Sequence, residues 1–108
     1  MTLKVVEDLE KALANLPGMG RRSASRAALA LVRDQDRLIV PLLAALNAAR
    51  AEVVSCSKCG SFTVRSANPC VCCSDDTRDS TILCVVEEPA DIVQIESSGA
   101  FKGKYHCL

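Results

Sequence analysis

The stretch CSKCGSFTVRSANPCVCC, residues 56–73, holds five of the seven cysteines in the chain. It opens with a C-x-x-C-G turn made by Cys56, Cys59 and Gly60, and a second cluster begins at Cys70, after ten intervening residues. Two thiolates spaced in this way can bind one face of a tetrahedral metal ion, and the glycine suits a tight turn with positive φ. The same cysteines could instead form disulfides or a redox pair, so the surrounding sequence has to decide between these chemistries.

The spacing C-x₂-C-x₁₀-C-x₂-C predicts a closed site in which Cys56, Cys59, Cys70 and Cys73 bind one structural Zn²⁺. Cys72 is the alternative fourth ligand, although a Cys70–Cys72 pair would strain the turn. A redox C-x-x-C opens a helix after a strand, whereas the sequence GSFTV that follows this pair is typical of a strand. Clustered cysteines in a reducing cytosol also favour metal ligation over disulfides.

A metal also explains how so small a segment can fold. Residues 55–75 contain few large apolar side chains, and structural zinc contributes on the order of 10–16 kcal/mol in zinc-finger peptides. The two remaining cysteines, Cys84 and Cys107, lie in apolar runs, so we expect them to be buried as small apolar residues.

The charge of the chain is balanced overall but unevenly distributed. Its 108 residues carry 13 basic and 13 acidic side chains, with a net charge of +4 in residues 1–65 and −4 in residues 66–108. Residues 1–65 could therefore bind a polyanion, which residues 66–108 would repel. The same charge counts are equally compatible with an ordinary solvated surface. Aromatic residues make up 3% of the chain, which leaves little for stacking single-stranded bases. A charged, amphipathic start without a signal peptide or a long apolar run predicts a soluble, cytoplasmic protein.

Hydrophobic periodicity predicts an α+β, multi-module fold. Three helices precede the cysteines, and a strand, a helix ended by Gly99 and a second strand follow them, which indicates a parallel βαβ unit. The apolar run TILCVVE is typical of a buried strand. Because two strands do not complete a parallel sheet, we expect the chain to stop within a fold. The expected elements are helices at 5–16, 21–32 and 37–54, a strand at 81–87, a helix at 88–98 and a strand at 103–108.

The sequence LPGMGRRSASR, residues 16–26, predicts a helix–hairpin–helix. Gly18 and Gly20 allow backbone N–H groups to approach an anion, and the N-terminus of the following helix adds its dipole. Arg22 and Arg26 lie four residues apart on one helix face, and Ser23 offers a hydroxyl, so a nucleic-acid phosphate is the natural ligand. The alternative is a plain turn between helices with solvated arginines. A dinucleotide-binding loop would need a third glycine where Ser23 stands, and a P-loop would need Gly-Lys-Ser/Thr.

In this order, the motifs resemble the RecR family of bacterial recombination-repair proteins. The matching stretches are LPGMGRRSASRAAL, CSKCGSFT with CVCC, and RDSTILCVVEEPADIVQIESSGAFKGKYHCL. The resemblance implies a helix–hairpin–helix region for DNA binding and oligomerisation at 1–54, a four-cysteine zinc finger at 55–80 and the start of a Toprim domain at 81–108.

The resemblance also implies a non-enzymatic, DNA-binding mediator of DNA repair and recombination. Proteins of this family form homo-oligomeric rings, act with RecO and RecF, and help to load RecA onto gapped DNA. It implies DNA contacts for Gly18, Gly20, Arg22, Ser23 and Arg26, and zinc ligation by Cys56, Cys59, Cys70 and Cys73. Arg21 stands where relatives commonly have proline, so no role carries over to it.

Glu87 occupies the position of the first acidic residue of a Toprim domain, which suggests an alternative function. In topoisomerases and primases this glutamate works with a later Asp-x-Asp on Mg²⁺, and no such pair follows Glu87 here. The alternative is therefore a Mg²⁺-dependent Toprim nuclease or primase fragment. We favour the interpretation that Glu87 and Glu88 form an acid pair at a helix N-terminus, beside Pro89.

Overall fold

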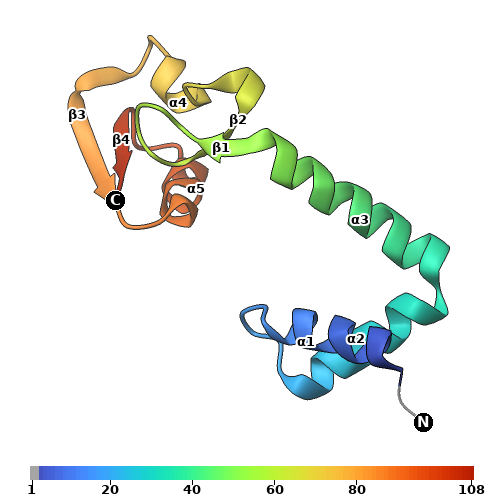
Figure 1. The fold of residues 1–108 in the computed structure, drawn as a ribbon. Helices are drawn as coiled ribbons and strands as arrows, with labels where there is room; N and C mark the ends of the chain where they lie inside the picture. The colour runs from blue at the N-terminus through green and yellow to red at the C-terminus, as the bar shows by residue number, and fades with distance from the viewer. Residues whose placement is uncertain (1–2) are drawn as a thin grey trace. The chain divides into compact units, whose positions relative to one another are not determined.

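The computed structural model describes residues 3–108, which divide into two compact units (Figure 1). One unit extends to Asn47, and the other covers Ala48–Leu108. The predicted division at 54 and 80 into three modules stays a prediction. Within residues 3–108, none of the helices has the length and apolar character needed to cross a lipid bilayer.

The first unit is built on two helices joined by a glycine turn, α1 (Lys4–Ala14) and α2 (Arg21–Arg33). They pack against each other through Ala24 and Ala28 of α2, which are almost completely buried. Residues four apart lie on one helix face, and alanine allows a neighbouring helix to approach closely. The predicted pair of short helices around residues 17–20 is therefore confirmed.

The third helix, α3 (Gln35–Glu52), begins in the first unit and ends in the second. The backbone carbonyl of Asp34, which precedes α3, accepts a hydrogen bond from the N–H of Leu38 at 3.0 Å. Helix α3 therefore begins two residues before the predicted start. Pro41 consequently lies inside the helix, beyond the first turn. None of the α3 side chains is buried within the described chain.

The second unit starts with a small antiparallel hairpin that carries the first pair of cysteines. The strand β1 (Val53–Ser55) pairs with β2 (Phe62–Val64), and the loop between them holds Cys56 and Cys59. A 3₁₀ turn, η1 (Arg65–Ala67), and the short helix α4 (Val71–Ser74) follow and bring in the second cysteine cluster. The strand predicted after the C-x-x-C-G turn is confirmed, whereas α4 is an element that the sequence did not suggest.

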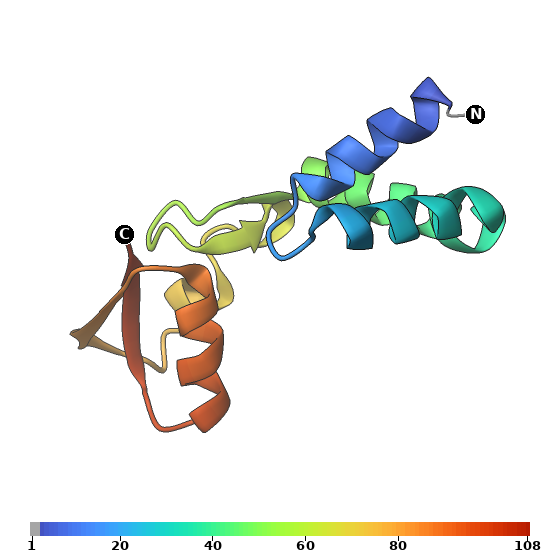
Figure 2. The same cartoon turned by 90° about the horizontal axis from the view of Figure 1, so that it is seen from below.

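The rest of the second unit is a parallel βαβ unit, as predicted. The strands β3 (Asp79–Val86) and β4 (Gly103–Cys107) pair in parallel, and α5 (Pro89–Ser98) connects them and runs back alongside β4 (Figure 2). Gly99 ends α5 in the left-handed conformation with φ +69°.

The core of this unit forms where β3, β4 and α5 meet. Val86, Tyr105 and Cys107 are buried, and five partly buried apolar residues pack against them: Cys72, Cys84, Ile92, Ile95 and Phe101. The expectation that TILCVVE forms a fully buried strand is wrong for the described residues. Ile82, Leu83 and Val85 stay exposed, and among the described residues β3 pairs with β4 alone. Leu83 and Val85 lie on the face opposite to Cys84 and Val86, which pack in the core.

Candidate metal centre and nucleic-acid interface

The four predicted cysteines lie together in the second unit. Cys56 and Cys59 come from the β1–β2 loop, Cys70 precedes α4 and Cys73 lies within it. Their sulfur atoms all lie within 4.8 Å of one another. The Sγ atoms of Cys56 and Cys73 are 3.8 Å apart, and those of Cys59 and Cys70 are 3.7 Å apart. Zn–S bonds of about 2.3 Å in a tetrahedron separate the sulfurs by about 3.8 Å, so the cluster fits one tetrahedral metal ion.

Backbone N–H groups direct their protons at Cys56. The Sγ atom of Cys56 accepts hydrogen bonds from Cys70 at 3.2 Å and from Lys58 and Cys59 at 3.5 Å each. Burial opposes ionisation of this thiol, but these bonds outweigh it and lower the pKa of Cys56 to about 6. Burial raises the pKa of Cys59 to about 11 and also raises that of Cys73. A bound dication would offset the cost of holding these thiolates in the interior.

Cys72 lies outside this cluster. Its Sγ atom is 3.9 Å from the carboxylate of Glu96, and its side chain packs against the core near Tyr105. The structure therefore groups Cys73, and not Cys72, with Cys56, Cys59 and Cys70. Cys72 and Cys73 are adjacent in the chain, but their side chains have different neighbours. The sulfur of Cys72 lies near Glu96, and that of Cys73 lies near Cys56.

The loop of the first cysteine pair is joined to the end of the parallel sheet. Gly60 has φ +80°, as expected after a C-x-x-C turn, and a Cβ atom there would lie 3.1 Å from the carbonyl oxygen of Cys107. The N–H of Cys107 donates to the carbonyl of Cys59 at 2.7 Å. Within the loop, the N–H of Cys56 donates to the carbonyl of Ser61 at 2.6 Å. The metal centre and strand β4 are thus mechanically connected.

The glycine turn in the first unit leaves the predicted anion-binding groups open to solvent. Gly18 has φ +79°, which requires glycine, and both Gly18 and Gly20 have empty space where a side chain would start. The first intrahelical bond of α2 runs from Ala24 to the carbonyl of Gly20 at 2.9 Å. The N–H groups of residues 21–23 therefore have no acceptor within the helix.

Arg22, Ser23 and Arg26 are exposed on α2, on the side away from the buried Ala24 and Ala28. Among residues 3–108, the ion pairs do not include Arg22 or Arg26. The structure thus brings two arginines, a hydroxyl and a helix N-terminus to one end of α2. The chemistry of this end suits a phosphate, because free N–H groups and cations meet there.

Comparison of the sequence with known proteins shows what this chain is similar to. Residues 6–50 match the family model described as "RecR, helix-hairpin-helix". Over 103 residues, or 95% of the chain, the sequence is 50% identical to each of the proteins named "Recombination protein RecR" from Phenylobacterium zucineum, Caulobacter sp. and Methylocella silvestris. The chain is thus similar to RecR proteins along almost its whole length. It spans about half the length of these curated RecR relatives.

Glu87 and Glu88 have different surroundings in this chain. Glu88 is the N-cap of α5, and its N–H donates to the Asp91 carboxylate at 3.1 Å in a reciprocal capping box. This confirms Glu88 as a helix N-terminal acid. Glu87 is exposed directly after β3. In the described part of the chain, the metal-binding groupings of Cys, His, Asp and Glu do not include Glu87.

Two cations that the sequence did not single out hold the segment around the second cysteine cluster in place. The Nζ atom of Lys104 donates to the carbonyls of Cys72, Cys73 and Asp75 at 3.1, 3.2 and 2.8 Å. A cation at the C-terminal end of a helix satisfies its free carbonyls. Lys104 lies about thirty residues away in sequence, so no local pattern could have indicated this contact.

Arg78 is the second of these cations. Its guanidinium pairs with Glu96, donates to the Gly103 carbonyl at 3.1 Å and lies 5.9 Å from the centre of the Tyr105 ring. Tyr105 also donates its hydroxyl to Glu96. Hydrogen bonds from Arg78 and Tyr105 lower the pKa of Glu96, while burial raises that of Tyr105. This cluster ties the end of the cysteine segment to α5 and β4.

We expect Arg78→Met to lower the free energy of unfolding by about 1–3 kcal/mol, because it leaves Glu96 half-buried without its charged partner. The folded-state pKa of Glu96 is depressed, so the stabilisation is present above the ordinary carboxyl pKa and is lost on acidification. Urea unfolding at pH 7 measures the effect. Lys102→Met is the matched control, since Lys102 is exposed, and an equal loss in both variants would contradict the role given to Arg78.

Proposed function

We propose that this chain is part of a RecR-type recombination mediator that binds DNA and performs no catalysis itself. The observation that carries the proposal is the 50% identity to proteins named for recombination, over 95% of the chain. The hairpin that matches the helix–hairpin–helix model supports DNA binding, and the four-cysteine cluster supports a structural metal.

The proposed DNA interface is the glycine turn and the first turns of α2. Arg22 and Arg26 would each neutralise a phosphate, Ser23 would donate its hydroxyl, and Gly18 and Gly20 would let the backbone approach the same strand. These groups recognise the sugar-phosphate backbone and carry no information about bases. The proposed binding therefore depends on salt concentration and is independent of DNA sequence.

The proposed metal is one structural Zn²⁺ held by Cys56, Cys59, Cys70 and Cys73. The sulfur separations fit Zn–S geometry, and four thiolates leave no open position for substrate. When bound, zinc supplies a cross-link between the β1–β2 loop and α4. This cross-link would hold in place the turn at Cys59 and Gly60, which contacts Cys107 of β4.

The proposed assembly is a homo-oligomer, either a dimer or a ring-shaped tetramer. Four large side chains of α3 are exposed: Val40, Leu42, Leu43 and Leu46. A helix with this much exposed apolar surface needs a partner, and a second copy of the chain is the proposed one. RecO-like and RecF-like proteins are the further partners proposed, in loading RecA on gapped DNA at the bacterial nucleoid, in the cytoplasm.

Residues 81–108 are proposed to begin a Toprim domain, which raises the alternative of a Mg²⁺-dependent nuclease or primase fragment. The observation that favours this alternative is the exposed position of Glu87 at the C-terminal end of a parallel strand. Parallel strands direct residues at this end towards a shared site. The identity to proteins named for recombination favours the mediator over this alternative.

A single experiment separates the two functions. A labelled gapped duplex is incubated with the chain and Mg²⁺, and both binding and strand cleavage or nucleotide incorporation are followed. We expect the DNA to be bound and to stay intact, with Glu87→Gln binding as the parent does. Turnover that disappears in Glu87→Gln would make the chain an enzyme fragment, and a lack of any DNA binding would contradict the mediator.

A further inference from the structure

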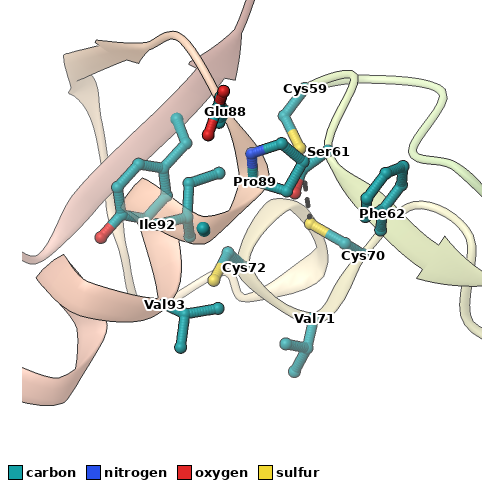
Figure 3. Close-up of a pocket in the computed structure, with 12 residues that line it drawn as sticks. Cys59, Ser61, Phe62, Cys70, Val71, Cys72, Glu88, Pro89, Ile92 and Val93 are labelled. Carbon is teal, nitrogen blue, oxygen red and sulfur yellow. Dashed lines mark hydrogen bonds between the residues drawn. The ribbon is translucent and has the colours of Figure 1, made fainter. Parts of the chain in front are cut away.

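A groove of about 670 Å³ lies in the second unit, between the cysteine turns and α5 (Figure 3). Phe62 of β2 and Val71 of α4 line one side, and Pro89, Ile92 and Val93 of α5 line the other. Positions 89, 92 and 93 share one helix face because they are three and four residues apart. The groove is therefore a predominantly apolar channel with walls from three elements.

Both sides of the groove are fixed by packing and hydrogen bonds. Ile92 and Cys72 pack against the core near Tyr105. Glu88, at the start of the α5 wall, belongs to the capping box with Asp91. A pre-formed site binds a partner without the entropic cost of ordering its own walls.

The apolar side chains at this groove are unusually open to solvent. Phe62 is 66% exposed, Val71 is 80% exposed and Val93 is 70% exposed. Single exposed apolar residues are common, but several around one hollow mark an interaction site. A partner with an apolar side chain would cover them.

The charge at the groove shows which kind of partner fits. Neither lysine nor arginine is among the twelve lining residues, whereas Glu88 is one of them. Cys59 and Cys70 also line the groove, and four thiolates around one Zn²⁺ carry two net negative charges. These groups repel a phosphate backbone and attract a cation, so the groove favours a basic protein segment over DNA.

We propose that this groove binds a segment of a protein partner that combines an apolar anchor with a lysine or arginine. The apolar side chain enters between Phe62 and Val93, and the cation lies beside Glu88. This site does not depend on DNA binding by the hairpin, which belongs to the other compact unit.

A random twelve-residue peptide library on phage, panned against the full chain carrying one equivalent of zinc, tests the proposal. The most enriched peptide is then synthesised and its affinity measured by fluorescence anisotropy. We expect it to carry lysine or arginine beside Leu, Ile, Phe or Trp. Val93→Lys should weaken its binding about tenfold or more, since an apolar anchor loses its pocket. Glu88→Gln, which keeps the capping acceptor, should weaken it by about threefold.

Two controls match these changes in residue type. Val5→Lys alters another exposed helical valine, in the first unit, and Asp76→Asn removes an acid that does not line the groove. Both should leave the affinity within about twofold of the parent. The proposal is overturned if no peptide is enriched, if enriched peptides lack basic residues, or if Val93→Lys binds them as tightly as the parent. Self-association that Val93→Lys abolishes would also overturn it, because the occupant would then be a second copy.

Discussion

Cys59→Ser should lose the metal and unfold residues 48–108. Cys59 has 2% of its surface exposed, and its carbonyl accepts the N–H of Cys107 in the last strand. The buried core of this unit is small, and structural zinc, worth on the order of 10–16 kcal/mol, is comparable to the whole stability of a typical domain, about 5–15 kcal/mol. Circular dichroism and metal analysis of the purified variant measure both effects.

Cys72→Ser is the matched control for this prediction. Cys72 lies one residue from a proposed ligand, but its sulfur faces Glu96, and a serine hydroxyl can still donate to that carboxylate. We expect this variant to keep one equivalent of zinc and the fold of the parent. Loss of zinc in Cys72→Ser together with its retention in Cys73→Ser would reverse the assignment of the fourth ligand.

The double variant Arg22→Ala/Arg26→Ala should weaken DNA binding by about 30-fold at low salt. Each exposed charge contact is worth about 1 kcal/mol, and two are removed. The slope of log affinity against log salt should become shallower by about two, since each lost phosphate contact removes about one released counterion. Fluorescence anisotropy with duplexes of two unrelated sequences measures the loss, which should be the same for both.

Arg33→Ala/Arg50→Ala removes the same charge from other parts of the chain and is the control for that measurement. Both arginines are exposed, and neither lies at the glycine turn. We expect this variant to keep most of the affinity and the salt slope of the parent. Equal losses in the two double variants would show that net charge matters and that the hairpin has no special role in binding.

The features that the sequence predicted correctly rest on local rules. The C-x-x-C-G turn is determined by a few adjacent residues, and Gly60 and Gly99 adopt the positive φ values expected of them. Helix α5 and the strands on either side of it follow from apolar periodicity and a single terminating glycine. Short-range chemistry was sufficient at these positions.

The features that the sequence did not reveal depend on contacts between distant segments. Lys104 holds the carbonyls of α4, and Arg78 meets Glu96 and Tyr105, in each case across many residues. The exposure of β3 was also missed, because an apolar run does not show whether another layer covers it. The apolar groove between the cysteine turns and α5 likewise exists only once these segments have packed.

Zinc K-edge X-ray absorption spectroscopy of the purified chain, with its zinc content measured on the same sample, tests the central claim most directly. A tetrahedral site built from Cys56, Cys59, Cys70 and Cys73 predicts one zinc per chain and a first shell of four sulfurs at about 2.3 Å. Less than half an equivalent of zinc, or a shell in which nitrogen or oxygen replaces sulfur, would contradict a four-thiolate centre.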